Sequence, residues 1–438
     1  MSSNAAQEFV NQLQYVERLI GENRLKDAAR ILNTLAKTAP EDPRLFLLGS
    51  IMAEAAQNSE GMLTAAQKAV VLAPGWPVAT IRLAGVYMTL GQADQAMHSA
   101  AQALGEAIQE STLSSDLLTR AAAIAVKNQN YPKAASWAAQ ASKLEPGNPQ
   151  LKHLWAEALA FNQQFEEAIS LYTELLTQTP ENTAILLDRL LAYVSTGQKG
   201  LALQDADRLL ASDHQNETYL YYATLLKGET PPTQPASVVQ RLFNFSAPHF
   251  DGHVVDNLLY KLPHDVAQMI LNWYPDKQVD VLDLGCGTGL LGASLGPLKG
   301  VIVGVDLSSE MIRHAHQHNV YAQFNQVNIL DALQATPAQH YDVITALNVL
   351  IYVGDLNPVI PNAHRILAPG GRFVFSCETA PKKIKTYALS ASHRFVHQKA
   401  HTQKLLQNVG FSDIQIEDCT LRLENGEPVQ GFVVTAQK

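Results

Sequence analysis

The stretch that decides the fold of the C-terminal half is Val281-Leu282-Asp283-Leu284-Gly285-Cys286-Gly287-Thr288-Gly289. An apolar run holds an acid, three glycines follow at alternate positions, and an apolar helical pattern begins at Leu290. This order predicts a strand, a tight turn and a helix N-terminus, because glycine tolerates positive φ and lets a ligand approach the backbone closely. A dinucleotide-binding turn would carry glycine at position 290, where this chain has leucine. The turn therefore predicts a nucleotide-like ligand of another kind.

Short apolar strands alternate with helices through residues 238–438, which predicts a parallel sheet with helical crossovers. The last two strands flank Asn425-Gly426, a strong hairpin signal. The expected strands are 279–284, 301–305, 322–327, 341–347, 372–376, 413–421 and 429–436. A Rossmann dehydrogenase would not normally end in such a hairpin.

Further motifs follow in order along these strands. Asp306 ends the second strand 17 residues after Gly289, where a carboxylate can accept both ribose hydroxyls of an adenosine lying over the turn. Asn328 follows the third strand, Asn348 follows the fourth, and Leu367-Ala368-Pro369-Gly370-Gly371 precedes the fifth. Together with the glycine turn, these motifs resemble class I S-adenosylmethionine-dependent methyltransferases, in which a seven-stranded Rossmann-like sheet ends in an antiparallel strand.

The resemblance implies a cofactor and the residues that bind it. S-adenosyl-L-methionine would be the methyl donor and S-adenosyl-L-homocysteine the product. The implied cofactor-binding residues are Asp283, Gly285, Cys286, Gly287, Gly289, Asp306, Leu307, Asn328, Ile329 and Asn348. The segments 242–253, 352–356, 393–397 (expected to open the last helix) and 421–429 look more narrowly like predicted bacterial methyltransferases with TPR repeats. That resemblance fixes no methyl acceptor.

We expect the methyl group to pass by in-line displacement to an oxygen or nitrogen nucleophile. Transfer from a sulfonium needs alignment and exclusion of water more than it needs acid–base chemistry. We expect residues 238–265 to form a lid, with Phe250, Tyr260 and Arg394 as lid or substrate residues. The candidate bases and pocket-wall residues are His249, His253, His397 and Tyr352, although a lid histidine can simply be solvated. An Asn/Asp-Pro-Pro-Tyr motif is absent at 348–351, which disfavours transfer to adenine N6 or to a glutamine amide.

Residues 1–228 are rich in Ala, Leu and Gln and carry a helical repeat. A small residue recurs in steps of 34, 34, 38, 34 and 34, and a proline usually follows it by twelve residues. The small residues are Ala28, a weaker copy at Met62, then Ala96, Ala134, Ala168 and Ala202, and the prolines are Pro40, Pro74, Pro146 and Pro180. The 34-residue period resembles tetratricopeptide (TPR) repeats. About six repeats would form a solenoid, with an insertion placed in a loop near residues 110–112.

The proline-rich segment 229–237 is expected to link this α-helical solenoid to the α/β domain at 238–438. A TPR groove can recruit a protein or peptide substrate or partner, or the array can serve assembly or regulation. Two alternatives therefore stay open beside a protein-directed enzyme. One is a small-molecule or natural-product methyltransferase, and the other is a non-catalytic adaptor, which the retention of Asp283, the three glycines and Asp306 disfavours.

The composition limits the kinds of partner, compartment and metal site that are expected for this protein. The formal charge of -9 argues against nucleic acid as a partner. The cysteines 286, 377 and 419 are scattered, and no apolar run is long enough to span a membrane, so a cytoplasmic protein is expected. Glu310, His314 and His318 share a helical spacing with His316 nearby, but they are expected to form a solvated helix face, and no metal is predicted.

Overall fold

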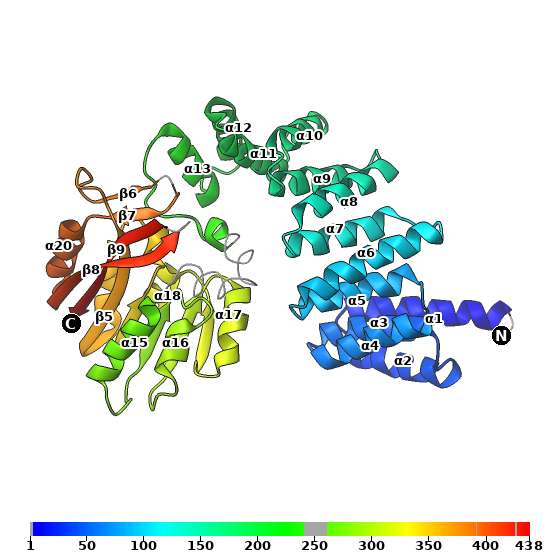
Figure 1. Ribbon diagram of the computed structural model, residues 1–438, viewed down its shortest axis with the longest axis horizontal. Coiled ribbons are helices and arrows are strands. Elements are labelled where there is room, and N and C mark those ends of the chain that lie inside the picture. Colours follow the sequence, from blue (N-terminus) through cyan, green and yellow to red (C-terminus); the bar gives the residue numbers. More distant parts are fainter. Residues whose placement is uncertain (1–2, 241–260, 391, 425–426) are drawn as a thin grey trace. The chain divides into compact units, whose positions relative to one another are not determined.

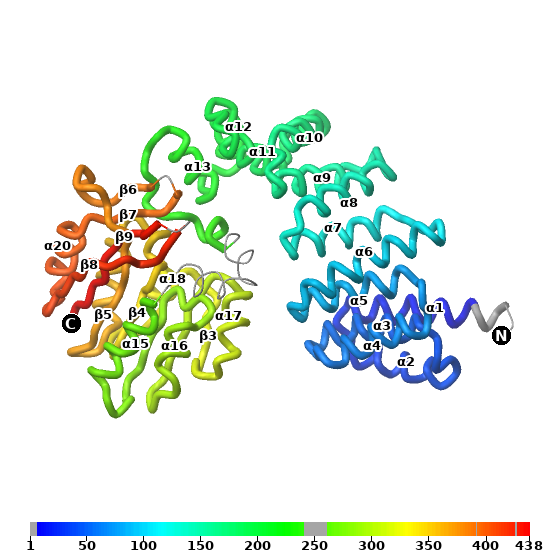
Figure 2. Tube along the Cα trace, viewed as in Figure 1, coloured from blue at the N-terminus to red at the C-terminus, as the bar shows by residue number. Residues whose placement is uncertain are grey.

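The computed structural model describes residues 3–240, 261–390, 392–424 and 427–438. The chain divides into two compact units, Met1–Leu209 and Leu210–Lys438, which are coloured blue to green and green to red in Figures 1 and 2. Each unit has its own hydrophobic core. The sequence placed the division at the prolines of 229–237, whereas the structure assigns those residues to the second unit.

The first unit is an array of paired helices (Figure 1). The pairs are α1 (Ser3–Gly21) with α2 (Leu25–Thr38), α3 (Pro43–Ala55) with α4 (Ser59–Leu72), α5 (Pro77–Thr89) with α6 (Ala93–Gln109), α7 (Ser115–Lys127) with α8 (Tyr131–Leu144), α9 (Pro149–Phe161) with α10 (Phe165–Gln178), and α11 (Thr183–Ser195) with α12 (Lys199–Ser212). This arrangement confirms the α-helical repeat fold predicted from the 34-residue period.

The recurring small residues close the contact between helices. The five alanines of the repeat are fully buried: Ala28, Ala96, Ala134, Ala168 and Ala202. Met62, at the equivalent position of the weaker copy, is 2% exposed. Complete burial without a larger side chain lets neighbouring helices approach closely, and a bulkier residue there would overpack the core. The periodicity therefore reports a packing requirement of the solenoid.

Helix ends follow local chemistry. Asp42, Asn148 and Asn182 each accept a hydrogen bond from a backbone N–H in the first turn of the helix that follows. Such N-caps satisfy donors that the helix itself cannot pair. The prolines of the repeat lie just past the ends of α2, α4, α8 and α10, where a missing N–H costs nothing.

Residues 110–112 lie in a turn, as predicted, but most of the insertion lengthens the helix before it. The second helices of the other repeats have 14 residues, whereas α6 has 17 and ends at Gln109. The extra residues thus lengthen α6 before the turn at 110–114. The alanine-rich sequence of α6 favours this outcome, because alanine has the highest helix propensity.

The second unit starts within the last turn of α12, continues with α13 (Glu217–Lys227) and is built on a mixed sheet. Its strands are β1 (Val281–Leu284), β2 (Ile302–Asp306), β3 (Gln323–Gln326), β4 (Tyr341–Ala346), β5 (Leu367–Thr379), β6 (Tyr387–Leu389), β7 (Phe395–His397), β8 (Ser412–Glu424) and β9 (Glu427–Gln437). The first five run parallel in the order β3-β2-β1-β4-β5, and β9 pairs antiparallel with β5 and β8. The predicted α/β fold with a terminal antiparallel hairpin is confirmed.

Helices cover both faces of this sheet (Figure 1). α15 (Leu262–Trp273) and α16 (Leu290–Leu295) pack on one face against Val281, Val343 and Val374. α18 (Ile329–Ala335), α19 (Ile360–Ile366) and α20 (Lys399–Val409) pack on the other face against Leu282, Ile344 and Phe373. Alternate residues of each strand thus face opposite cores, as the period of a strand requires. α17 (Ser309–Ala315) follows β2.

Strands β6 and β7 were not predicted, and residues 393–397 do not open the last helix, which begins at Lys399. Phe395–His397 form β7 and pair with Glu378 and Thr379 at the end of β5. Glu378 also pairs with Gly431 of β9, so β7 must occupy the opposite edge of β5. β4 pairs along this same edge, with residues of β5 that precede Glu378. The β6–β7 hairpin therefore extends the sheet beyond the carboxyl end of β4.

Candidate functional site

The glycine turn joins the carboxyl end of β1 to the N-terminus of α16. Gly285, Gly287 and Gly289 all have positive φ, between 54° and 85°. A Cβ at Gly285 would lie 2.5 Å from Val349 Cγ2, and one at Gly289 would lie 3.1 Å from Tyr321 Cε2. The glycines are therefore required by backbone conformation and close packing. The helix that they lead into has only six residues.

Asp283 lies near the carboxyl end of β1 and is 3% exposed. Its carboxylate accepts two hydrogen bonds, one from Tyr321 Oη to Oδ2 at 2.7 Å and one from Thr345 Oγ1 to Oδ1 at 2.8 Å. Burial nevertheless raises the pKa of Asp283 to about 6, because desolvation of the charge outweighs these two donors.

Asp306 ends β2 and is 9% exposed. The backbone N–H of Gly287 donates to Oδ2 and that of Ser308 donates to Oδ1, both at 2.9 Å. Burial raises the pKa of Asp306, while these backbone donors lower it. Each carboxylate oxygen keeps a second lone pair, so Asp306 can still accept two hydroxyl groups.

The two carboxylates flank one turn and lack a positive partner in the described part of the chain. No ion pair joins Asp283 or Asp306 to a described basic side chain, and the Asp306 charge further raises the pKa of Asp283. Buried acids are normally paired or hydrogen-bonded to cations. The arrangement can therefore accommodate a cationic group with hydroxyls beside it.

Three of the implied cofactor-binding residues, Leu307, Asn328 and Ile329, lie around the end of β3. The Leu307 carbonyl accepts hydrogen bonds from Gln240 Nε2 at 3.1 Å and from Gln326 Nε2 at 3.3 Å. Asn328 is the N-cap of α18, since its Oδ1 accepts the Leu330 backbone N–H at 2.8 Å. Ile329 is buried in the core beneath this turn. Cys286 is also buried, and burial raises the pKa of its thiol, so it is not a poised nucleophile.

Asn348 occupies the turn directly after β4 and has a left-handed φ of 54°. Its backbone N–H donates to Ser376 Oγ at 2.8 Å, and its Oδ1 accepts from Arg422 Nη1 at 2.7 Å. Because arginine can only donate, the amide oxygen must face Arg422 and the NH₂ group must face the other way. Non-glycine residues in this conformation are held there by their surroundings and cluster at functional sites.

A buried cluster of charges supports Asn348. Arg422 is 3% exposed and pairs with Glu378 and, at 2.9 Å, with Glu424. Arg394 also pairs with Glu424, so two arginines and two glutamates balance one another. Arg394, expected as a lid or substrate residue, is thus held in an ion pair. Tyr352 is 8% exposed beside this cluster, and burial raises the pKa of its phenol, which keeps it neutral.

His397 lies at the end of β7 and is 2% exposed. Its Nε2 donates to the carbonyls of Val353 at 2.9 Å and Gly354 at 3.2 Å. Nδ1 has no hydrogen-bond partner among the described residues. Burial lowers the pKa of His397 to about 4, so the ring is neutral near pH 7 and is a weak base there.

The segment expected as a linker packs beside His397. Pro232 O accepts the backbone N–H groups of Gly354 at 2.9 Å and Asp355 at 2.8 Å. Gln234 donates its backbone N–H to Tyr352 O at 3.0 Å. Residues 232–234 are therefore bound to the loop after β4, within the second unit. The lid candidates His249, Phe250, His253 and Tyr260 lie outside the described residues.

The Glu310-His314-His318 spacing does not form a single helix face. α17 ends at Ala315, and His316–His318 form a 3-10 turn. Glu310 pairs with Arg313 at 3.0 Å, while His316 packs against Phe324.

In the first unit, ligand atoms of His153, Glu157 and Asp188 lie within 4.8 Å of one another. His153 Nε2 lies 2.9 Å from Asp188 Oδ2, an ion pair between repeats that raises the pKa of His153 and already accounts for this cluster.

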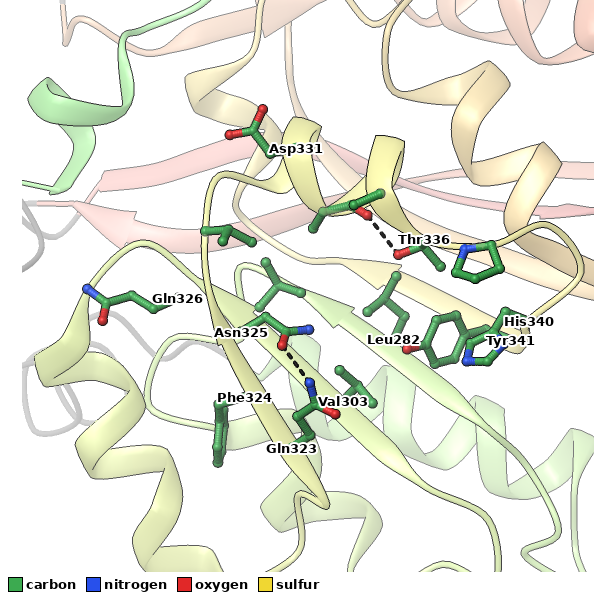
Figure 3. A pocket seen from close by; sticks show the side chains of 15 residues that line it. Leu282, Val303, Gln323, Phe324, Asn325, Gln326, Asp331, Thr336, His340 and Tyr341 are labelled. Carbon is green, nitrogen blue, oxygen red and sulfur yellow. Dashed lines mark hydrogen bonds between the residues drawn. The ribbon is translucent and has the colours of Figure 1, made fainter.

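A separate pocket of about 600 Å³ lies under α18 at the β3 edge of the sheet (Figure 3). Its lining includes Leu282, Val303, Phe324 and Tyr341. None of Asp283, Asp306 or Asn348 lines it. The pocket therefore opens on a face of the sheet and not at the carboxyl ends of β1, β2 and β4, where the predicted cofactor residues gather.

Sequence reasoning missed four residues that hold the site together: Tyr321, Thr345, Ser376 and Arg422. Thr345 lies three residues before Asn348 inside a predicted strand, so its hydroxyl could have been considered. The other three are distant in sequence from the motifs that they support. No spacing rule connects Arg422 with Asn348, 74 positions away.

Comparison with known proteins identifies the class of the second unit. Residues 282–373 match the family described as "Methyltransferase domain". This match, together with the observed strand order, confirms the class of domain predicted from the sequence. In the part of the chain that is described, no helix is long and apolar enough to cross a membrane.

Individual relatives resemble only part of the chain. It is 29% identical over 138 residues to the ubiquinone biosynthesis O-methyltransferase of Pseudomonas syringae pv. tomato, covering 30% of this chain and 59% of the relative. The chain thus spans about three fifths of that relative's length. The chain is also similar to solved structures. One is magnesium protoporphyrin IX methyltransferase from Synechocystis PCC 6803, with 17% identity, coverage of 46% of this chain and 99% of that chain, and a TM-score of 0.37. Another is YrrB, a TPR protein, with 17% identity, coverage of 43% of this chain and 96% of that chain, and a TM-score of 0.38.

Proposed function

We propose that the second unit is an S-adenosylmethionine-dependent methyltransferase that transfers the methyl group to an oxygen nucleophile, and that the TPR array recruits a protein or peptide. The observation that carries the cofactor assignment is the pair of buried carboxylates, Asp283 and Asp306, without a basic partner among the described residues. S-adenosylmethionine brings an ammonium, a sulfonium and two ribose hydroxyls. A dinucleotide would bring phosphates, which two buried acids repel.

Individual residues of the site can be matched to individual groups of this cofactor. Asp306, whose oxygens keep free lone pairs, would hold the ribose hydroxyls. Asp283 would hold the ammonium of the methionine part, which supplies the missing positive charge. Gly285 and Gly289 keep side chains out of the turn, so the ligand can approach the backbone. When bound, the cofactor supplies an electrophilic methyl group on sulfur.

Two observations support an oxygen acceptor. The relatives that match residues of the second unit include O-methyltransferases. Arg422 donates a hydrogen bond to the amide oxygen of Asn348, so the NH₂ group of Asn348 remains available as a donor. A donor at the end of β4 suits a hydroxyl or phenolate oxygen, which has lone pairs, whereas an attacking amine would offer N–H groups to it. Asn348 would therefore orient the acceptor, and buried Tyr352 would form a wall that excludes water.

Recruitment through the TPR array is the second part of the proposal. The first unit exposes a repeated helical surface, and repeat arrays of this kind offer an extended surface for partners. The small-molecule alternative predicts that the second unit works equally well alone. The array would then serve assembly or regulation.

A methyl-transfer assay tests both parts. Purified full-length protein and tritiated S-adenosylmethionine would be added to a bacterial lysate, and the label separated into protein and small-molecule fractions. We expect label at oxygen, with loss of labelling in an Asp306→Ala variant. Once the acceptor is isolated, a protein lacking residues 1–209 is compared with the full chain. Equal turnover of the isolated acceptor would contradict recruitment by the array and leave the methyltransferase assignment intact.

A further inference from the structure

Tyr321 lies between α17 and β3, in a position that neither the glycine motif nor the strand-end acids specify. Its hydroxyl donates to Asp283 Oδ2 at 2.7 Å and accepts the backbone N–H of Gly292 at 3.2 Å. One phenol therefore joins the acidic end of β1 to the first turn of α16, on both sides of the glycine turn.

The packing around this ring is close. A Cβ at Gly292 would lie 2.4 Å from Tyr321 Cε2, and one at Gly289 would lie 3.1 Å from the same atom. The ring also packs near Phe324, with ring centroids 4.7 Å apart. Two glycines thus make room for a tyrosine, and the ring has little freedom to leave Asp283.

The groups around Asp283 make its charge sensitive to this one hydroxyl. Tyr321 donates from the segment before β3, and Thr345 donates from β4. Asp306, at the end of β2, is acidic and raises the pKa of Asp283, and the Cys286 thiol is held neutral by burial. Burial and the Asp283 charge raise the pKa of Tyr321, so the phenol keeps its proton and remains a donor. With no basic group among these neighbours, the two hydroxyls are the groups that favour the carboxylate.

We propose that Tyr321 is a positioning residue of the cofactor site. Its hydroxyl keeps Asp283 ionised and aimed at the ammonium of the ligand, and it fixes the glycine turn against α16. The inference rests on the proposed binding of S-adenosylmethionine. It assigns to Tyr321 a role in setting the pH range over which the site accepts a cationic amino-acid group.

The test is calorimetric titration of the full-length protein with S-adenosyl-L-homocysteine between pH 5 and pH 8. This probe keeps the ammonium but lacks the sulfonium, so it isolates the contact with Asp283. For the wild type, affinity is expected to fall as the pH drops through about 6, where Asp283 takes up a proton. For Tyr321→Phe, the loss of a donor raises the pKa of Asp283 further. The midpoint should then move up by about one pH unit, with affinity about fivefold weaker near pH 6 and recovered by pH 8.

Two further variants complete the experiment. Thr345→Val removes the other donor and should move the midpoint in the same direction, which keeps the test open if Tyr321→Phe folds poorly. Tyr341→Phe is the matched control, a buried tyrosine at the opposite end of β4 that should leave the midpoint unchanged. A Tyr321→Phe profile with the wild-type midpoint, or equally weakened at every pH, overturns the inference. Absence of binding to the wild type overturns the proposed function, and this inference with it.

Discussion

Arg422 Nη1 donates a 2.7 Å hydrogen bond to Asn348 Oδ1 and so joins β8 to the turn after β4. Arg422 is almost fully buried and also holds Glu378 and Glu424. A buried guanidinium needs an acceptor for each of its N–H groups, so the orientation of the Asn348 amide is set by the charge cluster behind it. The side-chain donor of Asn348 that faces the site is thus oriented by a residue 74 positions away in the sequence.

This relationship predicts different effects for two substitutions at Asn348. Asn348→Asp keeps an acceptor for Arg422 but adds an acid to a cluster whose charges already balance, so it should change the urea midpoint little. Asn348→Leu leaves an N–H group of Arg422 unpaired in the core and should cost about 1–3 kcal/mol in unfolding free energy. In the labelled-methyl assay both variants should be impaired, because both lose the NH₂ donor. Full transfer activity in Asn348→Asp would contradict the assigned role.

Asp306→Ala should weaken S-adenosyl-L-homocysteine by at least tenfold, because both ribose hydroxyls lose a charged acceptor. The measurement is isothermal calorimetry at pH 7.5. Asp276→Ala is the control, since Asp276 is an exposed acid before the amino end of β1, opposite the end that carries the glycine turn. Equal affinities for Asp306→Ala and the wild type would refute the cofactor assignment.

Gly285→Ala should destabilise the protein by more than about 2 kcal/mol, since φ is +69° and the new Cβ would lie 2.5 Å from Val349. Gly105→Ala is the matched change in the interior of α6, where a Cβ meets nothing within 4 Å. It should instead stabilise by up to about 1 kcal/mol. Thermal unfolding of the two variants checks this, and a Gly285→Ala variant as stable as the wild type would show that the turn tolerates a side chain.

Asp283→Asn should stabilise the protein at pH 7 while it abolishes cofactor binding. The pKa of Asp283 is raised from 3.8 to about 6 in the folded state, so the folded state binds the proton more tightly. The carboxyl therefore costs stability progressively as pH rises from about 4 to 6, on the order of 2–3 kcal/mol above that range. Denaturation at pH 4 and pH 7 measures the difference. A variant that is less stable at pH 7 would contradict a buried, uncompensated charge.

His397 should contribute to acid lability. Its pKa is lowered from 6.5 to about 4, so the unfolded chain takes up the proton first and stability falls as pH decreases from 6.5 toward 4. His397→Gln keeps a side-chain N–H donor for the Val353 carbonyl and cannot titrate. The unfolding free energy of this variant should therefore fall less than that of the wild type between pH 7 and pH 5. Parallel pH curves would show that His397 is not buried in its neutral form.

The sequence by itself was sufficient for the features that depend on local pattern. The repeat appears in sequence because each helix pair must bury a small residue such as Ala168, and the same constraint recurs with every pair. The glycine turn and Asp306 could be placed because the carboxyl ends of parallel strands meet at one edge of a sheet. The terminal hairpin carried its own turn signal.

Only the tertiary structure decided which side chains complete the site. Tyr321 reaches Asp283 across 38 positions, and Arg422 reaches Asn348 across 74. Strand β7 is three residues long and pairs with the end of β5, so its formation depends on an edge that another segment provides. Contacts of this kind are selected by burial and by the need to pair every buried donor and charge. Those conditions arise only when distant segments pack together, and for that reason they leave no periodic signal in the chain.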